Sequence, residues 1–251
     1  MLFAVVGVVA IILAIAAAIS GLAISRRILS LSSLRENHPV GAVFLSVVGT
    51  SYGVLVAFVA SVVWSQYEET RGAVAKEANG LAVLVQIATA APPAEGRLLR
   101  EAILRYGRHV LDVEWPAMAS GAFDRSRTPE FDELFRAVMA LPSSTARDAA
   151  LFETALDRLE TIGDSRRVRV AASRETLPLS LWVALVGGGA QVVIFTYFFG
   201  HHSLRSQAVM TALLTGMIGW LLFVIVQLDN PFGNVTPLSP APIAAVIDGA
   251  R

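Results

Sequence analysis

The sequence predicts an all-α integral membrane protein with four transmembrane helices and a helical stalk domain inserted between the second and third. Four apolar runs support this prediction, Leu2–Ile24, Val40–Trp64, Leu179–Gly200 and Ala208–Leu228, and none contains Asp, Glu, Lys or Arg. Each run has about 20 residues or more, which is enough for a helix to cross the hydrocarbon core. The composition agrees, because 16% of the residues are charged, whereas soluble chains carry about 25%.

The order of the apolar runs divides the chain into four parts. We expect transmembrane helices 1 and 2 in residues 1–64, a helical extramembrane stalk domain in 65–176, transmembrane helices 3 and 4 in 177–229, and a proline-rich tail in 230–251. The first run has small residues that would suit signal cleavage, but no basic residue precedes it and Arg26 and Arg27 follow it. Since a secretory signal has the opposite polarity, we expect a retained helix.

The residues between the second and third spans have the periodicity of helices and no sustained alternation typical of strands. The second span is predicted to continue as one helix to about Thr89, before Pro92 and Pro93. A second helix is expected over 95–120, with a kink or break at Pro116. A short third helix begins at Thr128 as its N-cap, and Ser143 or Ser144 is predicted to cap the last one.

The second span is the most polar of the four. Thr50, Ser51 and Tyr52 lie within it, followed by an apolar stretch that includes Phe58 and Val62. One interpretation is close helix packing, because small and hydroxyl residues allow it. The other is that these five residues line a water-filled pore in which Phe58 and Val62 form an apolar constriction. Phe58 and Val62 are one turn apart and share a face, whereas Tyr52 lies off that face.

A group of arginines precedes the third span and includes Arg166, Arg167, Arg169 and Arg174. They are typical of a solvated or headgroup-facing helix end. The functional alternative is an anion-attracting vestibule, formed when several subunits surround one axis.

Several classes of function find no support in the sequence. There is no Cys, and no catalytic, phosphate-loop or metal-binding pattern, so we expect no enzyme activity, no cofactor and no metal. The net charge is zero, which gives no indication of nucleic-acid binding. Proton-coupled transporters usually carry charged residues inside the membrane, and the four runs contain none.

Short ordered segments resemble the bacterial bestrophin-like domain family. The matching segments are Tyr52–Phe58 with Trp64 and Tyr67, Val74–Asn79 with Leu81, Tyr106, Glu114–Pro116, Arg166–Arg169 before Pro178, and Leu228–Gly233 before Ser239 and Pro240. The resemblance implies the layout of bestrophins, which are pentameric anion channels with four spans and a large helical domain between the second and third. The proline- and aromatic-rich motifs of a bestrophin constriction are not found here, so no gate residue is carried over from that family.

The resulting functional hypothesis is an oligomeric ion channel in the bacterial inner membrane, with selectivity for anions as its narrower form. Its partners would be the lipid bilayer, inorganic ions and further copies of the chain, and a pentamer is implied by the resemblance. The alternative is a membrane-anchored scaffold or sensor whose helical domain binds a partner. The short loops carry Arg26, Arg27, Arg35 and Arg205, which slightly favours a periplasmic stalk, whereas the resemblance implies a cytoplasmic one.

Overall fold

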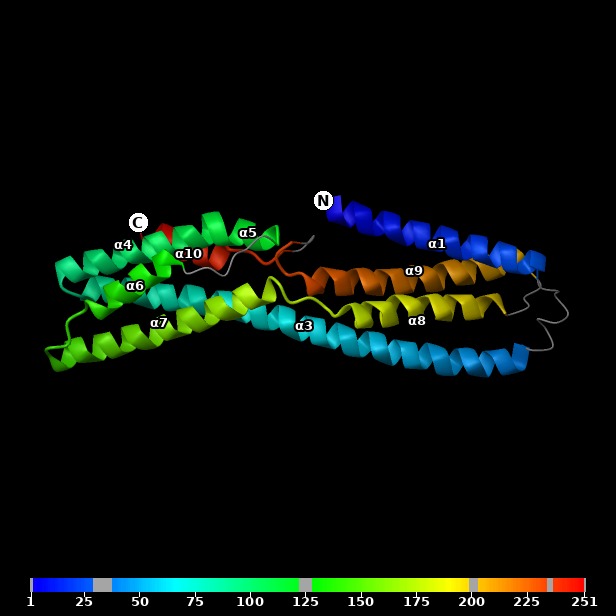
Figure 1. The fold of residues 1–251 in the computed structure, drawn as a ribbon, viewed down its shortest axis with the longest axis horizontal. Coiled ribbons are helices and arrows are strands. Elements are labelled where there is room, and N and C mark those ends of the chain that lie inside the picture. Colours follow the sequence, from blue (N-terminus) through cyan, green and yellow to red (C-terminus); the bar gives the residue numbers. More distant parts are fainter. Residues whose placement is uncertain (1, 29–37, 122–127, 199–202, 234–236, 251) are drawn as a thin grey trace. The chain divides into compact units, whose positions relative to one another are not determined.

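A computed structural model describes residues 2–28, 38–121, 128–198, 203–233 and 237–250. The described part of the chain is helical and contains no β-strand, which confirms the predicted all-α class (Figure 1). The chain divides into two compact units. Unit 1 comprises Met1–Ser65 and Thr176–Asp229, and unit 2 comprises Gln66–Glu175 and Asn230–Arg251.

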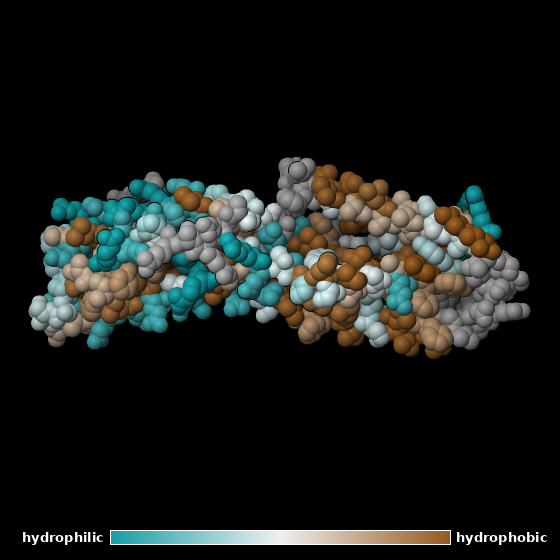
Figure 2. Space-filling view, in the orientation of Figure 1, coloured by the Kyte–Doolittle hydropathy of each residue, from teal (hydrophilic) through white to brown (hydrophobic). Residues whose placement is uncertain are grey.

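Unit 1 contains the four helices that are long and apolar enough to span a membrane. They are α1 (Leu2–Ile28), the first part of α3 (His38–Ala90), α8 (Leu179–Tyr197) and α9 (Leu204–Asp229). Apolar side chains gather on the surface of this unit in Figure 2. Leu13, for example, is 63% exposed and Leu213 is 70% exposed. A surface of this kind suits lipid, so the structure agrees with the predicted four-span membrane protein.

Glycines bring the helices of unit 1 close together. On α9, Gly219 faces the side chain of Ile11 on α1. On α1, Gly21 lies beneath the ring of Tyr197 from α8, whose hydroxyl donates a 2.8 Å hydrogen bond to the carbonyl of Ala18. In lipid, helices are held together by van der Waals packing and hydrogen bonds rather than by hydrophobicity. Small residues let the helices come close enough for both.

Unit 2 is built from the second part of α3 and from shorter helices. These are α4 (Pro93–His109), the π-helical turn η1 (Val110–Glu114), α5 (Trp115–Ala119), α6 (Pro129–Met139), α7 (Ala146–Ala172) and α10 (Ala241–Gly249). Their apolar stripes form one core that includes Leu81, Leu99, Ile103, Leu134 and Ile162. A stalk domain with its own core is therefore present between the second and third spans.

Helix α3 ends at Ala90, before Pro92 and Pro93, as the sequence predicts. Pro116 ends no helix, because the backbone stays helical from α4 through the π-helical turn η1 into α5, and the irregularity expected near Trp115 is this π-helical turn. The cap predicted for α7 is wrong: Thr145 takes this position, and its hydroxyl accepts a 3.1 Å hydrogen bond from the backbone N–H of Asp148. Thr145 has the same capping chemistry as Ser143 and Ser144, so the sequence alone does not distinguish them.

The C-terminal segment packs within unit 2. Ile247 of α10 lies against Gly107 of α4, where a Cβ atom would come within 2.1 Å of the Ile247 side chain. Phe232 is buried and its ring makes an edge contact with Trp115 at a centroid distance of 5.4 Å. The segment expected to be a proline-rich tail thus contributes a helix and an aromatic ring to the core.

Candidate functional site

One side of α3 in unit 1 is buried against α8. Tyr52 is 8% exposed and covers Gly188 and Gly189, where added Cβ atoms would lie 2.8 Å from its ring and 2.9 Å from its hydroxyl oxygen. Val56 and Val59 continue the buried side toward the end of the span. Tyr52 therefore packs inside the chain, in a space that the missing glycine side chains leave open.

The opposite side of α3 is exposed in the part of the chain that the structure describes. We call it the outer face of α3 and define it by its exposed residues Val47, Thr50, Ser51, Val54, Phe58 and Ser61. Phe58 is 65% exposed, and Val62 is half-buried at the edge of this face. Among the five pore candidates, the structure thus places Thr50, Ser51 and Phe58 together and separates them from Tyr52.

Polar side chains of unit 1 pair with one another near the N-terminal end of α9. Gln207 is buried, and its amide nitrogen donates to the carbonyl of Thr196 at 2.9 Å. The amide oxygen of Gln207 accepts from Nε of Arg26 at 3.1 Å. The hydroxyls of Thr196 and Thr211 are 3.3 Å apart. These bonds join α1, α8 and α9, which suits polar groups in a low-dielectric surrounding.

Unit 2 contains a buried network of charged side chains centred on Arg169. Its Nε donates to Glu77 Oε2 at 2.8 Å, and its Nη2 donates to Glu77 Oε1 at 3.0 Å and to Glu114 Oε2 at 2.7 Å. The side chains of all three residues are fully buried. Burying charges is unfavourable unless they are paired and hydrogen-bonded, and here both conditions hold.

The remaining oxygen of Glu114 is also paired. Arg166 donates to Glu114 Oε1 from Nε at 2.9 Å and from Nη2 at 2.6 Å. The hydroxyl of Thr128 lies 3.4 Å from the same oxygen and contacts Arg166 as well. Thr128 was predicted as the N-cap of α6 and occupies that position, but its side chain makes no capping bond. Its hydroxyl contacts Glu114 and Arg166 of the charge network instead.

Aromatic side chains enclose the network. The buried Tyr106 hydroxyl donates to Glu77 Oε1 at 2.6 Å. Burial raises the pKa of Tyr106 well above its usual value, and the charge of Glu77 raises it further. The guanidinium of Arg169 lies 5.7 Å from the centroid of the Trp115 ring, which allows a cation–π contact.

The charges at the edge of the network involve His109. Its Nδ1 lies 3.4 Å from Glu130 Oε1, and its Nε2 lies 4.0 Å from Glu114 Oε1.

Burial alone raises the pKa of Glu114, but the guanidiniums of Arg169 and Arg166 lower it, and the net direction is downward. Burial lowers the pKa of Arg169, whereas Glu77 raises it and prevails. Glu114 and Arg169 therefore form a stable ion pair at neutral pH.

The comparison with known families decides what kind of protein this is. A family profile described as the bestrophin-like domain matches residues 12–243. This chain belongs to the bestrophin-like family. The resemblance seen in the short sequence segments is therefore confirmed.

Solved structures share the fold of this bestrophin-like chain. A variant of a bacterial bestrophin homologue from Klebsiella pneumoniae is 12% identical with a TM-score of 0.68, and covers 96% of this chain and 97% of its own. Another variant of a bestrophin homologue from that organism is 13% identical with a TM-score of 0.65, covering 96% and 98%. A crystal structure described as a membrane protein is 12% identical with a TM-score of 0.69, covering 96% and 97%. A comparison with curated proteins found no match.

The bestrophin-like segments quoted from the sequence meet in the charge network. Glu77, Tyr106, Glu114, Arg166 and Arg169 each come from one of them, although their side chains had no common role in the sequence analysis. A local signal for Glu77 was available, because this charge interrupts the apolar stripe formed by Val74, Ala78 and Leu81. A charged residue on the buried side of a helix indicates a buried partner.

The four arginines predicted for a vestibule have different surroundings. Arg169 is buried and Arg166 is 18% exposed at its side chain, and both are neutralised by carboxylates. Arg167 and Arg174 are exposed, and Arg167 pairs with Asp164. Solvent-facing positive charge in this segment of the bestrophin-like chain therefore comes from Arg167 and Arg174. Within the described ranges, no group of three or more His, Asp or Glu residues is placed to hold a metal ion.

Proposed function

We propose that this bestrophin-like protein assembles as a homo-oligomeric ion channel in the bacterial inner membrane, with the pore lined by the second span. The observation that carries the proposal is the outer face of α3. It presents hydroxyls at Thr50 and Ser51 and then apolar side chains at Val54 and Phe58, and all four are exposed within the described ranges. Repeated around an axis, such a face gives a polar entrance and an apolar constriction.

The rest of unit 1 supports a membrane location for this assembly. We place the bilayer around residues 1–64 and 177–229, with 65–176 and 230–251 outside it. The pentamer that the family resemblance implies is the assembly we propose, because five copies of the outer face would be shielded from lipid. Arg174 would supply positive charge near the membrane and favour anions, whereas the charge of Arg167 is offset by Asp164.

Conductance decides between this proposal and its alternative. Purified protein reconstituted in planar bilayers is expected to conduct, with a reversal potential in a chloride gradient that follows chloride. Single-particle analysis of the same sample is expected to show a central hole on a symmetry axis. Absence of current from an intact oligomer would favour the membrane-anchored scaffold or sensor, in which unit 2 binds a partner.

A further inference from the structure

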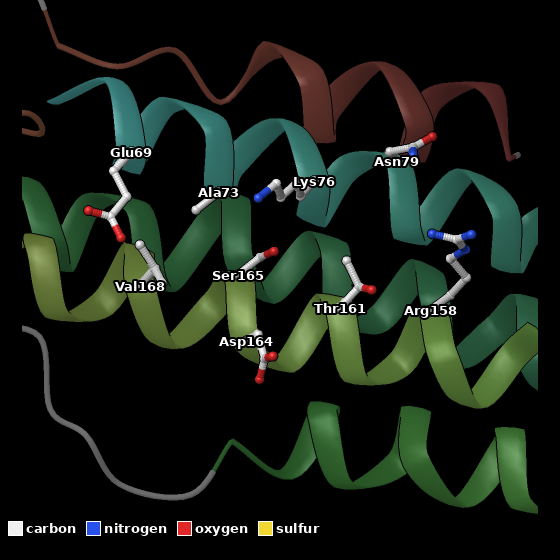
Figure 3. A pocket seen from close by; sticks show the side chains of 9 residues that line it. All are labelled: Glu69, Ala73, Lys76, Asn79, Arg158, Thr161, Asp164, Ser165 and Val168. Carbon is white, nitrogen blue, oxygen red and sulfur yellow. The ribbon is translucent and has the colours of Figure 1, made fainter. Parts of the chain in front are cut away.

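Unit 2 contains a polar groove between α3 and α7 that is separate from the charge network (Figure 3). Its volume is about 470 Å³, within the range of small-molecule sites, about 300–1,000 Å³. The polar residues that line it on α3 are Glu69, Lys76 and Asn79, and those on α7 are Arg158, Thr161, Asp164 and Ser165.

One end of the groove lacks an acceptor. Nε of Arg158 is buried and has no hydrogen-bond partner among the described residues, while Nη2 of this side chain reaches Asp157 at 3.5 Å. Asn79 lies toward the same end, whereas Lys76 lies midway along the groove, between Arg158 and Glu69 (Figure 3), and neither makes an ion pair or side-chain hydrogen bond within the part of the chain that the structure describes. A buried donor without an acceptor is unfavourable and calls for a bound group. A carboxylate matches these donors.

The other end of the groove lacks a cation. Glu69 has no ion-pair partner in the described ranges, and it precedes Lys76 by seven positions on α3. Two helical turns, a rise of about 10 Å, separate these residues, so they are too far apart for the usual i,i+4 pair. The remaining carboxylate of the groove, Asp164, binds Arg167 and points away from α3 in Figure 3. The groove thus has a positive end, where Nε of Arg158 is left without an acceptor, and a negative end, where Glu69 has no cation among the described residues.

We propose that the groove binds an elongated small zwitterion. The ligand's carboxylate lies between Lys76 and Arg158, with Asn79 as a further donor, and its ammonium lies at Glu69. An ω-amino acid has this separation of charges, whereas a simple anion satisfies only one end. The site lies entirely in unit 2 and does not depend on whether the protein conducts ions.

Titration calorimetry on the full-length protein in detergent tests the proposal with three probes of equal chain length. 6-Aminohexanoate carries both charges, hexanoate only the carboxylate and hexylamine only the ammonium. We expect 6-aminohexanoate to bind at least about tenfold more tightly than either singly charged probe, since each end contributes charge-assisted hydrogen bonds. Lys76→Gln and Glu69→Gln should each weaken its binding by a similar factor.

Arg71→Gln is the matched control, because Arg71 lies on the same helix, is exposed and pairs with Glu68 outside the groove. This variant should bind 6-aminohexanoate like the parent. If hexanoate bound as tightly as 6-aminohexanoate, and Glu69→Gln bound 6-aminohexanoate as tightly as the parent, the ligand would not be a zwitterion. No binding of any probe would overturn the site. A change of oligomeric state in both Lys76→Gln and Glu69→Gln would also overturn it, by assigning the groove to the contact with a second copy.

Discussion

Arg169 on α7 and Glu77 on α3 form a two-pronged ion pair inside unit 2, with N–O distances of 2.8 and 3.0 Å. The residues are 92 positions apart in the sequence, and neither side chain is exposed. The planar guanidinium matches the carboxylate in two parallel hydrogen bonds, which Lys cannot reproduce. This pair therefore fixes the relative position of the two long helices of unit 2.

Removing one member of this pair should strongly destabilise unit 2. Arg169→Met leaves Glu77 and part of Glu114 buried without their cation, and uncompensated charges of this kind cost about 3–5 kcal/mol. Arg169→Lys should recover only part of the loss, because an ammonium cannot make the paired bonds. Thermal or denaturant unfolding of the purified protein measures both effects.

The exposed Arg147 near the start of α7 is the control for that experiment. Arg147→Met should change the free energy of unfolding by less than about 0.5 kcal/mol, as surface substitutions usually do. If Arg169→Met were as stable as Arg147→Met, the network would not hold the domain together.

Acid should weaken the domain through Glu114. The folded protein lowers the pKa of this carboxyl below its ordinary value of 4.5. Between the two pKa values the unfolded chain binds more protons, so stability rises with pH in that window. The contribution of Glu114 is fully present above about pH 4.5 and is lost as the pH falls through the lower, folded pKa.

A pH series of unfolding measurements checks this dependence. Glu114→Gln should be less stable at pH 7, and the difference from the parent should shrink as the pH falls below 4.5. Glu153→Gln, at an exposed position of α7, is expected to follow the parent throughout. A constant gap between Glu114→Gln and the parent at every pH would contradict the assignment.

The sequence was sufficient to predict the four spans, but not the contacts between helices. Uncharged apolar runs of this length have one stable solution in a bilayer, a helix whose backbone groups are paired internally. Whether a given charge is buried depends on another helix far along the chain, as Arg169 and Glu77 show. Local periodicity predicts which face of a helix is buried, but not which other helix packs against that face. The helices could therefore be predicted from the sequence, whereas the charge network could not.

The packing of Tyr52 on α8 gives a prediction for adjacent glycines. Gly188→Ala would place a Cβ atom 2.8 Å from the Tyr52 ring, so the two helices must separate. Overpacking of this size costs about 1–3 kcal/mol. Gly187→Ala is the matched control, because nothing lies within 4 Å of its Cβ position. Thermal stability in detergent should fall for Gly188→Ala only, and an equal effect in both variants would argue against the contact.

The orientation of the protein can be read with single cysteines, because the natural chain has none. Ser32 lies between the first two spans in the sequence and outside the described residues, and Ser144 is exposed between α6 and α7. With a periplasmic stalk, Ser144→Cys should react with a membrane-impermeant thiol reagent once the outer membrane is permeabilised, and Ser32→Cys should not. The reverse pattern would place the stalk in the cytoplasm.

The outer face of α3 gives the most direct test of the proposed pore. Phe58 is 65% exposed in the single chain and follows the hydroxyls of Thr50 and Ser51 by about two turns. An apolar constriction blocks ions because water leaves it, so a hydroxyl there should favour wetting. Phe58→Ser, and to a smaller extent Val62→Ser, should raise basal conductance in planar bilayers. Val186→Ser is the matched control, since Val186 on α8 is 55% exposed but does not belong to this face. If currents through Phe58→Ser and Val62→Ser equalled the parent's, the gate would have to lie elsewhere in the chain.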